Sequence, residues 1–230
     1  MAAERKDPTF LLGVDGVTEL MLVRHAKQAQ RDDFLGHAVG ELHDPPLAEL
    51  GQRQAKAVAA LLADEGIEAV YASRSQRAGD TAAAIGAAVG LEVTVVDGIE
   101  EYGFFRDLPD DKPPLESLGE LRFRGFQRRW SRTRTWDAWP ASEPPAEFRS
   151  RVADSIEGII AAHPGQRVVV ATHGGVINQY VGDFLGTSDD MFTTPPHASV
   201  TRVRAKHDRR VLLSLNEHQH LTGPDELLTF

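Results

Sequence analysis

The chain has 230 residues, of which 41% are hydrophobic and 26% charged. These proportions are ordinary for a globular protein, and a core of this size buries roughly 70% of the surface that the unfolded chain exposes. The sequence contains no cysteine, which excludes disulfides, thiolate nucleophiles, cysteine zinc sites and iron–sulfur clusters. The net charge of −9 disfavours a general nucleic-acid binder, and no stretch approaches the ~20 consecutive apolar residues of a membrane span. We therefore expect no nucleic-acid and no membrane partner.

The first strand is expected close to the start of the chain. The opening residues MAAERKDPTF carry charges where a signal peptide needs an apolar core, so we expect a cytoplasmic protein. Residues 1–18 are polar and are predicted to form a tail. The apolar run 20–23 is typical of a strand buried on both faces, and it stops at Arg24-His25. Residues 26–48 contain two glycines and two prolines and are predicted to be a long loop, which is usually functional.

Strand and helix patterns alternate along most of the remaining chain. Helices are predicted at 49–63, 77–89, 146–162 and from Gly174-Gly175 to 184, and strands at 70–72, 91–96, 167–171, 200–204 and 211–215. This alternation predicts a three-layer α/β/α fold whose central sheet is mostly parallel, with helices on both faces. The proline-rich segment 102–145, with one helix expected near 116–135, predicts a cap-like insertion over the crevice. We expect a single domain over 19–230.

Two histidines stand in matching positions. His25 follows the strand 20–23, and His173 follows the strand 167–171. In parallel α/β sheets the ligand crevice lies beyond the carboxyl ends of the strands, so both imidazoles reach one crevice if their strands are neighbours. One histidine at a strand end is usually a satisfied polar residue, but two at the same kind of junction favour a site.

Arginines and helix starts accompany the histidines. Arg24 precedes His25, Arg77 begins the helix after the strand 70–72, and Gly174-Gly175 begins another helix. Helix starts offer unpaired N–H groups and the positive end of the helix dipole. Two planar guanidinium groups, two imidazoles and two helix starts around one point predict a pocket for a dianion such as phosphate.

Four short motifs, taken in order, resemble those of a known family. They are Leu22-Val23-Arg24-His25-Ala26, Asp44-Pro-Pro-Leu-Ala-Glu-Leu-Gly51, Ser73-x-x-x-Arg77-Ala78-x-x-Thr81 and Thr172-His173-Gly174-Gly175. Together they resemble the histidine phosphatase superfamily, in its phosphoglycerate-mutase-like branch 1. The resemblance covers about residues 19–204.

The resemblance implies a mechanism that these residue types allow. His25 would attack phosphorus as a neutral imidazole and form a phosphohistidine that water then hydrolyses. Nearby arginines lower the pKa of His25 and favour that neutral form. Arg24, Arg77, His173 and the backbone at Gly174 would hold the phosphate oxygens. The resemblance implies a metal-independent phosphoric monoester hydrolase with no cofactor and no metal.

The family places its acid, a glutamate, after the third strand. Ile99-x-Glu101 fits that pattern best, so we expect Glu101 to protonate the leaving group, with Glu100 as the second choice. A pair of glutamates that merely caps a strand is the alternative. Arg31 stands where the family often has asparagine and is expected to contact the phosphate or the rest of the substrate. His197 also replaces a usual asparagine and is expected to line the crevice.

Three functions fit such a pocket. The first is a phosphomonoesterase acting on a small phosphorylated metabolite, and the second is a phosphoglycerate-type mutase. A mutase needs a second anion site, which Arg128 and Arg129 would supply. These are two of six arginines between 122 and 134, and the alternative is that this segment forms a solvated helix face. The sequence His173-Gly174-Gly175, where mutases tend to have His-Gly-Asn, favours the phosphatase. The third is an inactive protein that binds a phosphorylated ligand.

The sequence leaves two further points open. A metal site at His218 and His220 is the alternative to a polar solvated end of the chain, which we favour. The oligomeric state is not determined, with a homodimer as one option.

Overall fold

The computed structural model describes residues 6–29, 37–223 and 226–230, and it contains one six-stranded sheet in the order β3-β2-β4-β1-β5-β6. The strands are β1 (Thr18–Arg24), β2 (Ala69–Ala72), β3 (Val93–Val95), β4 (Arg167–Thr172), β5 (Val200–Lys206) and β6 (Arg209–Glu217). The first four of these in the sheet order, β3, β2, β4 and β1, run parallel, whereas β5 and β6 are antiparallel to their neighbours. The predicted mostly parallel sheet is therefore confirmed.

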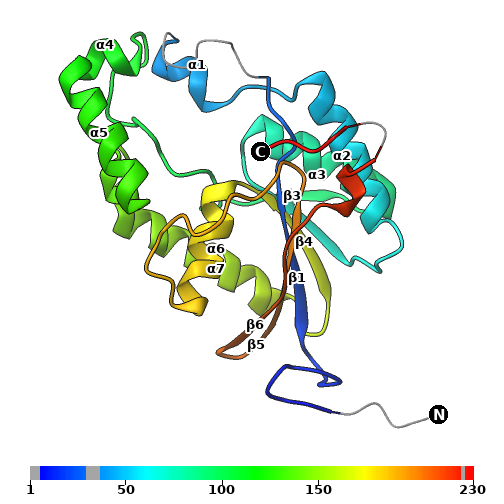
Figure 1. The fold of residues 1–230 in the computed structure, drawn as a ribbon. Helices are drawn as coiled ribbons and strands as arrows, with labels where there is room; N and C mark the ends of the chain where they lie inside the picture. The colour runs from blue at the N-terminus through cyan, green and yellow to red at the C-terminus, as the bar shows by residue number, and fades with distance from the viewer. Residues whose placement is uncertain (1–5, 30–36, 224–225) are drawn as a thin grey trace.

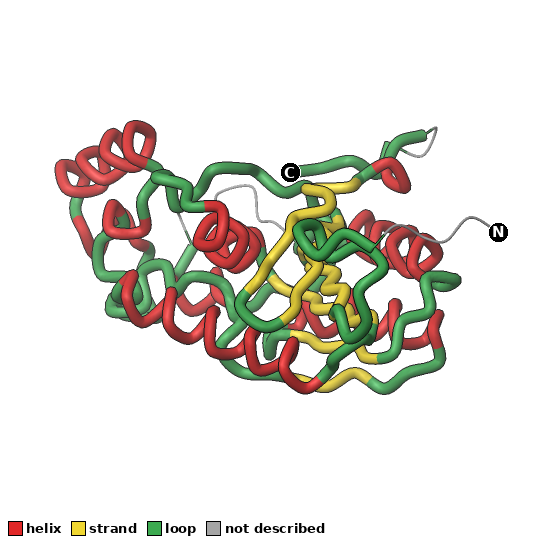
Figure 2. The backbone as a smooth tube through the Cα atoms, turned by 90° about the horizontal axis from the view of Figure 1, so that it is seen from below, coloured by secondary structure: helices red, strands yellow, loops and turns green. Residues whose placement is uncertain are grey.

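Helices cover both faces of this sheet, as Figures 1 and 2 show. They are α1 (Val39–His43), α2 (Glu49–Leu62), α3 (Gln76–Val89), α4 (Pro114–Leu118), α5 (Glu120–Thr133), α6 (Pro145–Ala162) and α7 (Gly174–Leu185), with short 3₁₀ turns at Trp136–Ala138 and Gln219–Leu221. Successive side chains of a strand point to opposite faces. Met21 and Val23 of β1 accordingly pack with α2 and α3, while Leu20 and Leu22 pack with α6 and α7. The continuous apolar run of β1 follows from burial on both faces.

The register of the two central strands brings the histidine motifs together. Strand β1 pairs in parallel with β4, and Arg24 stands opposite Thr172. The N–H of His25 donates to the carbonyl of Thr172 at 2.8 Å. Residues that follow β1 and β4 therefore emerge side by side at one edge of the sheet.

The segment between β3 and α6 projects over that edge and forms a cap, defined here as residues 102–145 (Figure 1). The single helix expected near 116–135 is wrong, because the chain breaks into α4 and α5 at Gly119. Gly119 has φ +75°, a conformation that glycine adopts without the steric cost of a Cβ. Phe105 and Phe123 are buried in the cap against further aromatic side chains.

Three other boundaries differ from the prediction. The expected loop 26–48 contains α1, whose five residues are too short to show a helical period. The expected strand 91–96 is reduced to β3, which lies at the sheet edge with Val95 59% exposed. Within the expected tail, Leu11 is buried and β1 already begins at Thr18. Within the described ranges no helix is long and apolar enough to span a bilayer.

Candidate active site

The two motif histidines lie next to each other, as their matching positions predict. The ring centroids of His25 and His173 are 5.1 Å apart, and the residues are 3% and 0% exposed. They reach this point from the ends of β1 and β4, which the sheet places side by side. The site is thus built from backbone elements that the core holds in place.

The hydrogen bonds of His25 determine which of its nitrogens carries the proton. Nδ1 lies 2.8 Å from the carbonyl oxygen of Ala26, which only accepts, so Nδ1 carries the hydrogen. Nε2 therefore carries no hydrogen, and its lone pair accepts the Nε–H of Arg77 at 3.2 Å. Burial, followed by the charges around His173, Arg77 and Arg24, lowers the pKa of His25 well below its usual value. His25 is therefore a neutral imidazole with its lone pair directed into the cationic site.

His173 is held in the opposite tautomer. Its Nδ1 lies 3.3 Å from Arg77 Nη2, which only donates, so Nδ1 accepts. Its Nε2–H donates to Ser73 Oγ at 2.8 Å. Burial and then the charges of Arg77 and Arg24 lower the pKa of His173 well below its usual value. His173 can donate to an anion from Nδ1 only after taking up a proton there, which a bound dianion favours.

Arg24 presents an unused donor to the site. Its two terminal nitrogens donate to Pro195 O and, at 3.0 Å, to His197 Nε2. Its Nε is buried and has no hydrogen-bond partner within the described part of the chain. Burial lowers the pKa of Arg24 to about 10, and the charge of Glu101 opposes that shift, so the group stays cationic at neutral pH. A buried donor without a partner is rare and suits a ligand oxygen.

Arg77 is held in place by His43 and by Asp44, the first residue of the second motif. Its Nη1 donates to His43 O at 3.0 Å and lies 3.6 Å from Asp44 Oδ1. The same Asp44 oxygen accepts the N–H of Gln76 at 2.8 Å, at the start of α3. Asp44 therefore orients the arginine and satisfies the helix start from which that arginine projects.

Glu101 follows β3 in the chain and lies against the start of α7, close enough for its charge to act on Arg24 and Arg77. Its carboxylate accepts the N–H of Tyr102 at 3.0 Å and the N–H of Gly175 at 3.3 Å. A Cβ on Gly175 would lie only 2.1 Å from Glu101 Oε1, so this contact requires glycine at 175. Glu100 instead accepts the N–H of Gly98. Of the two glutamates, Glu101 is therefore the one whose carboxylate contacts α7, and its role as the acid stays a prediction.

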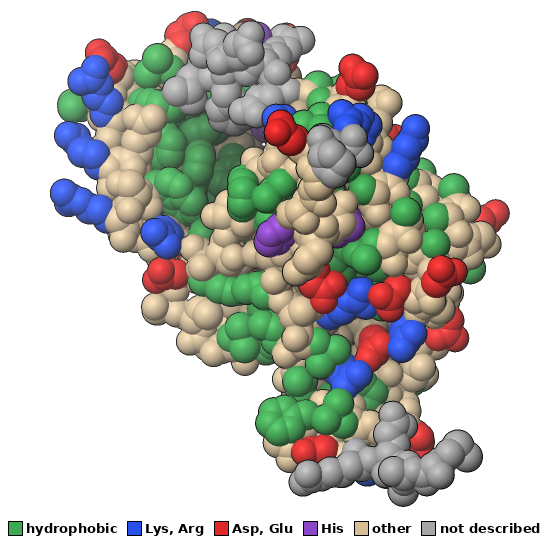
Figure 3. Space-filling model, turned by 45° about the vertical axis from the view of Figure 1, so that its right-hand side comes forward, with side chains coloured by type: hydrophobic (Ala, Val, Ile, Leu, Met, Phe, Trp, Pro, Cys, Tyr) green, Lys and Arg blue, Asp and Glu red, His purple; other side chains and the backbone are tan. Residues whose placement is uncertain are grey.

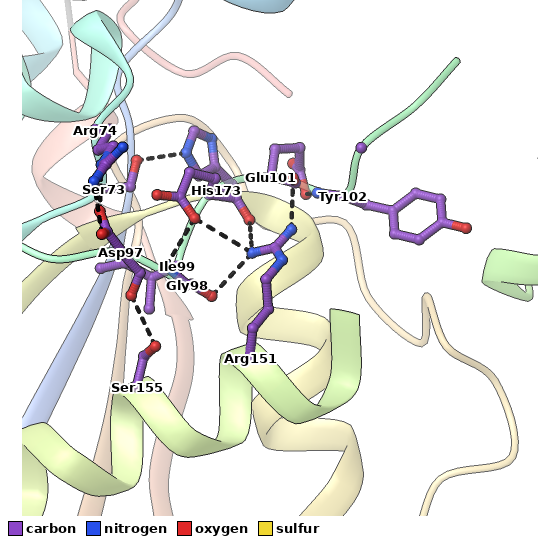
Figure 4. A network of polar contacts seen from close by, with 12 residues as sticks. Ser73, Arg74, Asp97, Gly98, Ile99, Glu101, Tyr102, Arg151, Ser155 and His173 are labelled. Carbon is purple, nitrogen blue, oxygen red and sulfur yellow. Dashed lines mark hydrogen bonds and ion pairs between the residues drawn. The ribbon is translucent and has the colours of Figure 1, made fainter. Parts of the chain in front are cut away.

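A half-buried arginine that sequence reasoning missed holds the glutamate loop (Figure 4). Arg151 of α6 donates to the carbonyl oxygens of Gly98, Glu100 and Glu101 at 2.9, 2.8 and 3.0 Å. It also forms a bidentate ion pair with Glu143, at 2.6 and 2.7 Å. In the sequence Arg151 resembles any surface arginine of an amphipathic helix, so no local signal marks it.

Next to the histidines lies a cavity of about 390 Å³. Arg77, His173 and Glu101 line one end of it. His25 is nearly fully buried beside Arg77, so a phosphate group would reach Nε2 from this end of the cavity. A site that opens onto a cavity of this size is suited to a small organic phosphate.

Other predicted residues lie elsewhere. Arg31 falls outside the described residues. Arg128 and Arg129 are exposed on α5, Arg129 pairs with Asp137 at 2.6 Å, and neither is among the described residues that line the cavity. The second anion site that a mutase needs is therefore not found at this pair.

The three other histidines that the sequence analysis singled out make ordinary polar contacts. His197 lies with its ring 5.6 Å from that of His25 and contacts Arg24, but it is not among the described residues that line the cavity. His218 and His220 contact the backbone carbonyls of Asn216 and Ala198 through Nδ1 and Nε2, respectively. Among the described residues no group of three or more His, Asp or Glu side chains is arranged to hold a metal ion.

Comparisons with known proteins agree with the four motifs. The family model of the histidine phosphatase superfamily (branch 1) matches residues 20–218. The chain belongs to this family. Phosphoserine phosphatase 1 of Hydrogenobacter thermophilus is 30% identical over 209 residues, which cover 89% of this chain and 95% of that protein. The metal-independent phosphoserine phosphatase of Arabidopsis thaliana is 28% identical over 222 residues, covering 90% and 84%.

A solved structure shows the same fold. A phosphoserine phosphatase variant from Entamoeba histolytica, in complex with phosphoserine, aligns with TM-score 0.67 at 21% identity and covers 89% of this chain and all of its own. The family match and the two phosphoserine phosphatase relatives confirm the predicted phosphoric monoester hydrolase. The mutase is the less favoured alternative.

Proposed function

We propose that this histidine phosphatase hydrolyses its substrate through a phosphohistidine on His25. The observation that carries the proposal is the neutral Nε2 of His25, whose lone pair faces the guanidinium of Arg77. That nitrogen is a nucleophile without prior deprotonation, and the surrounding cations attract the phosphate that it attacks.

In the first step His25 Nε2 forms a bond to phosphorus as the bond from phosphorus to the leaving oxygen breaks. The bonding electrons go to that oxygen, which takes a proton from Glu101. Arg77 and the free Nε–H of Arg24 stabilise the charge on the transferring group. His173 adds a donor once Nδ1 is protonated.

In the second step water attacks the phosphohistidine. Glu101 takes a proton from this water, the bond between phosphorus and Nε2 breaks, and inorganic phosphate leaves. Both steps use the same carboxylate, first as acid and then as base. The site therefore returns to its starting state with no other reactant than water.

A panel of phosphomonoesters tests this function. Since the named relatives are phosphoserine phosphatases, L-phosphoserine belongs in the panel, and 3-phosphoglycerate tests the mutase alternative. We expect release of inorganic phosphate that EDTA leaves unchanged and that His25→Ala abolishes. Full activity of the alanine variant, or loss of wild-type activity in EDTA, would contradict the proposal.

Two expectations from the sequence remain predictions. A cytoplasmic location is one, and the homodimer is the other. Light scattering of the purified chain decides between monomer and dimer.

A further inference from the structure

The cavity has two chemically different ends. Its polar end is the proposed phosphate site, whereas its other wall is built mainly from apolar side chains. These are Val39 and Leu42 of α1 and Tyr102, Phe104 and Phe105 of the cap. Figure 3 shows hydrophobic side chains gathered in a hollow between the cap and the rest of the molecule. We call these five residues the apolar wall.

The apolar wall is backed by the packed interior of the cap. Val39 is fully buried and Phe105 is 2% exposed, and both pack in one cluster with Phe123. Phe104 contacts Trp139, with ring centroids 4.3 Å apart. Such packing holds the wall in one shape before any ligand arrives, which lowers the entropic cost of binding.

The backbone at Phe105 supports a specific use for this wall. Phe105 has φ +58°, a left-handed conformation that is uncommon and strained for residues other than glycine. Its N–H is held by Ser142 Oγ at 2.9 Å. The chain therefore keeps an aromatic side chain where glycine would be the easier choice.

Two arginines that line the cavity beside the apolar wall already pair with acidic side chains. Arg74 donates to Asp97 at 2.6 Å, and Arg106 lies 3.3 Å from Glu147. Arg77 belongs to the phosphate end, and Asp44, Glu100 and Glu101 add negative charge to the lining. A carboxylate on the substrate would thus meet no unpaired arginine or lysine among the described lining residues outside the phosphate end.

We propose that the alcohol part of the substrate is an uncharged apolar group of several carbons, alkyl or aromatic, seated against the apolar wall. This inference rests on the proposed function, because the ester oxygen must lie between His25 and Glu101. The phosphate supplies the charge that the polar end recognises, and the carbon skeleton supplies the area that the wall buries. Small phosphates with a second anionic group are then poor substrates.

A series of ethyl, butyl and hexyl phosphate tests the inference. These alcohols have nearly the same basicity, so the chemical step changes little while the apolar area grows. Burial of a methylene favours binding by about fourfold, so we expect kcat/KM to rise roughly 10²-fold from ethyl to hexyl phosphate. L-phosphoserine and 3-phosphoglycerate should rank below butyl phosphate.

A matched pair of variants locates the effect. Leu42→Ser removes apolar area from the wall, and we expect the ratio of kcat/KM for hexyl to ethyl phosphate to fall about tenfold. Leu121→Ser is the same change at an 81% exposed position of the cap, and it should leave that ratio unchanged.

The outcomes separate this inference from the proposed function. Equal kcat/KM along the wild-type series, or phosphoserine above hexyl phosphate, would overturn the apolar substrate class. So would a Leu42→Ser variant with the wild-type ratio. Hydrolysis of nitrophenyl phosphate that depends on His25 would still support the phosphohistidine site in each of these cases, whereas its absence would reject the site itself.

Discussion

The two ends of the cavity are made in different ways. At the phosphate end, residues that follow β1 and β4 and those that begin α3 and α7 meet at one edge of the sheet. Every nitrogen of His25, His173 and Arg77 there has a polar neighbour. At the other end, the cap and the short α1 supply apolar side chains held by local aromatic packing.

The difference separates chemistry from selectivity. The sheet determines where the polar groups lie, so the same reaction can be retained while the cap changes. Replacements at the polar end should therefore change the chemical step for every substrate. Replacements at the apolar wall should change the ranking of substrates.

The largest effect should come from the nucleophile. His25→Ala removes the attacking nitrogen, and we expect kcat to fall by at least roughly 10⁴-fold, as for other covalent catalysts. His163→Ala, which precedes β4 at the opposite edge of the sheet, should keep activity. Steady-state kinetics of both variants, with circular dichroism to check folding, provide the measurement. A His25→Ala enzyme within tenfold of wild type would contradict the mechanism.

The next effect should depend on the leaving group. Glu101→Gln removes the proton donor, and we expect kcat/KM, which reports the phosphorylation step, to fall ~10²–10⁴-fold with ethyl phosphate but less with nitrophenyl phosphate. The nitrophenolate leaves without help, whereas the alkoxide needs a proton. Glu100→Gln is the matched control, since the Glu100 carboxylate contacts Gly98 and Arg151 but not α7. If Glu100→Gln alone showed this selectivity, the acid would be Glu100.

Arg151 allows the positioning of Glu101 to be tested separately from its chemistry. Arg151→Met removes the donor to three loop carbonyls. A displacement of Glu101 by about 1 Å would lower kcat/KM for ethyl phosphate roughly 10²-fold. The loss should again be smaller with nitrophenyl phosphate, whereas affinity for inorganic phosphate should stay the same. Arg149→Met on the same helix, which breaks an ion pair with Asp190, should not show this selectivity. A uniform loss with both substrates would indicate a merely structural role.

Stability should decrease in acid because of the buried histidines. Burial and the charge of Arg24 lower the pKa of His197 to about 3, from the usual value near 6.5. A depressed folded pKa means that the unfolded chain binds the proton first, so stability is full above about pH 6.5 and falls as the pH drops towards 3. Each such histidine lowers the unfolding free energy by up to about 1.4 kcal/mol for every pH unit of acidification in this range.

His197→Asn checks that sign. Between pH 6 and pH 4, the unfolding free energy of the variant should fall less steeply with decreasing pH than that of the wild type. The difference between the two slopes should correspond to at most one bound proton. Urea unfolding at several pH values measures it. An unchanged slope would mean that His197 is protonated in the folded state.

The smallest effect should lie on the outer face of the cap. Arg128 and Arg129 are exposed on α5. Replacing both by alanine should leave KM unchanged for 3-phosphoglycerate and for ethyl phosphate alike. A selective rise for 3-phosphoglycerate would restore the second anion site that a mutase needs.

The same division explains what the sequence could predict. His25, His173, Arg24 and Arg77 follow or precede strongly patterned elements, so their convergence follows from the order of strands and helices. Glu101 could be expected only through the family pattern, since its contact with Gly175 is formed across the fold.

The cap and its anchor could not be predicted in this way. The break at Gly119 and the helix α1 lie in segments too short or too irregular for a period to show. Arg151 takes its role from three carbonyls about 50 residues distant in the chain, a long-range contact that no local pattern encodes. The apolar wall likewise combines residues of α1 and the cap that only the folded chain brings together.

The central claim is a covalent phosphate on His25. Glu101→Gln enzyme mixed with radiolabelled nitrophenyl phosphate should accumulate the intermediate, because this leaving group departs easily while the later attack by water lacks its base. Quenching in alkaline denaturant, followed by peptide mapping, should place acid-labile phosphate on His25. Turnover of the same substrate with no label, or with label on any other residue, would contradict the account.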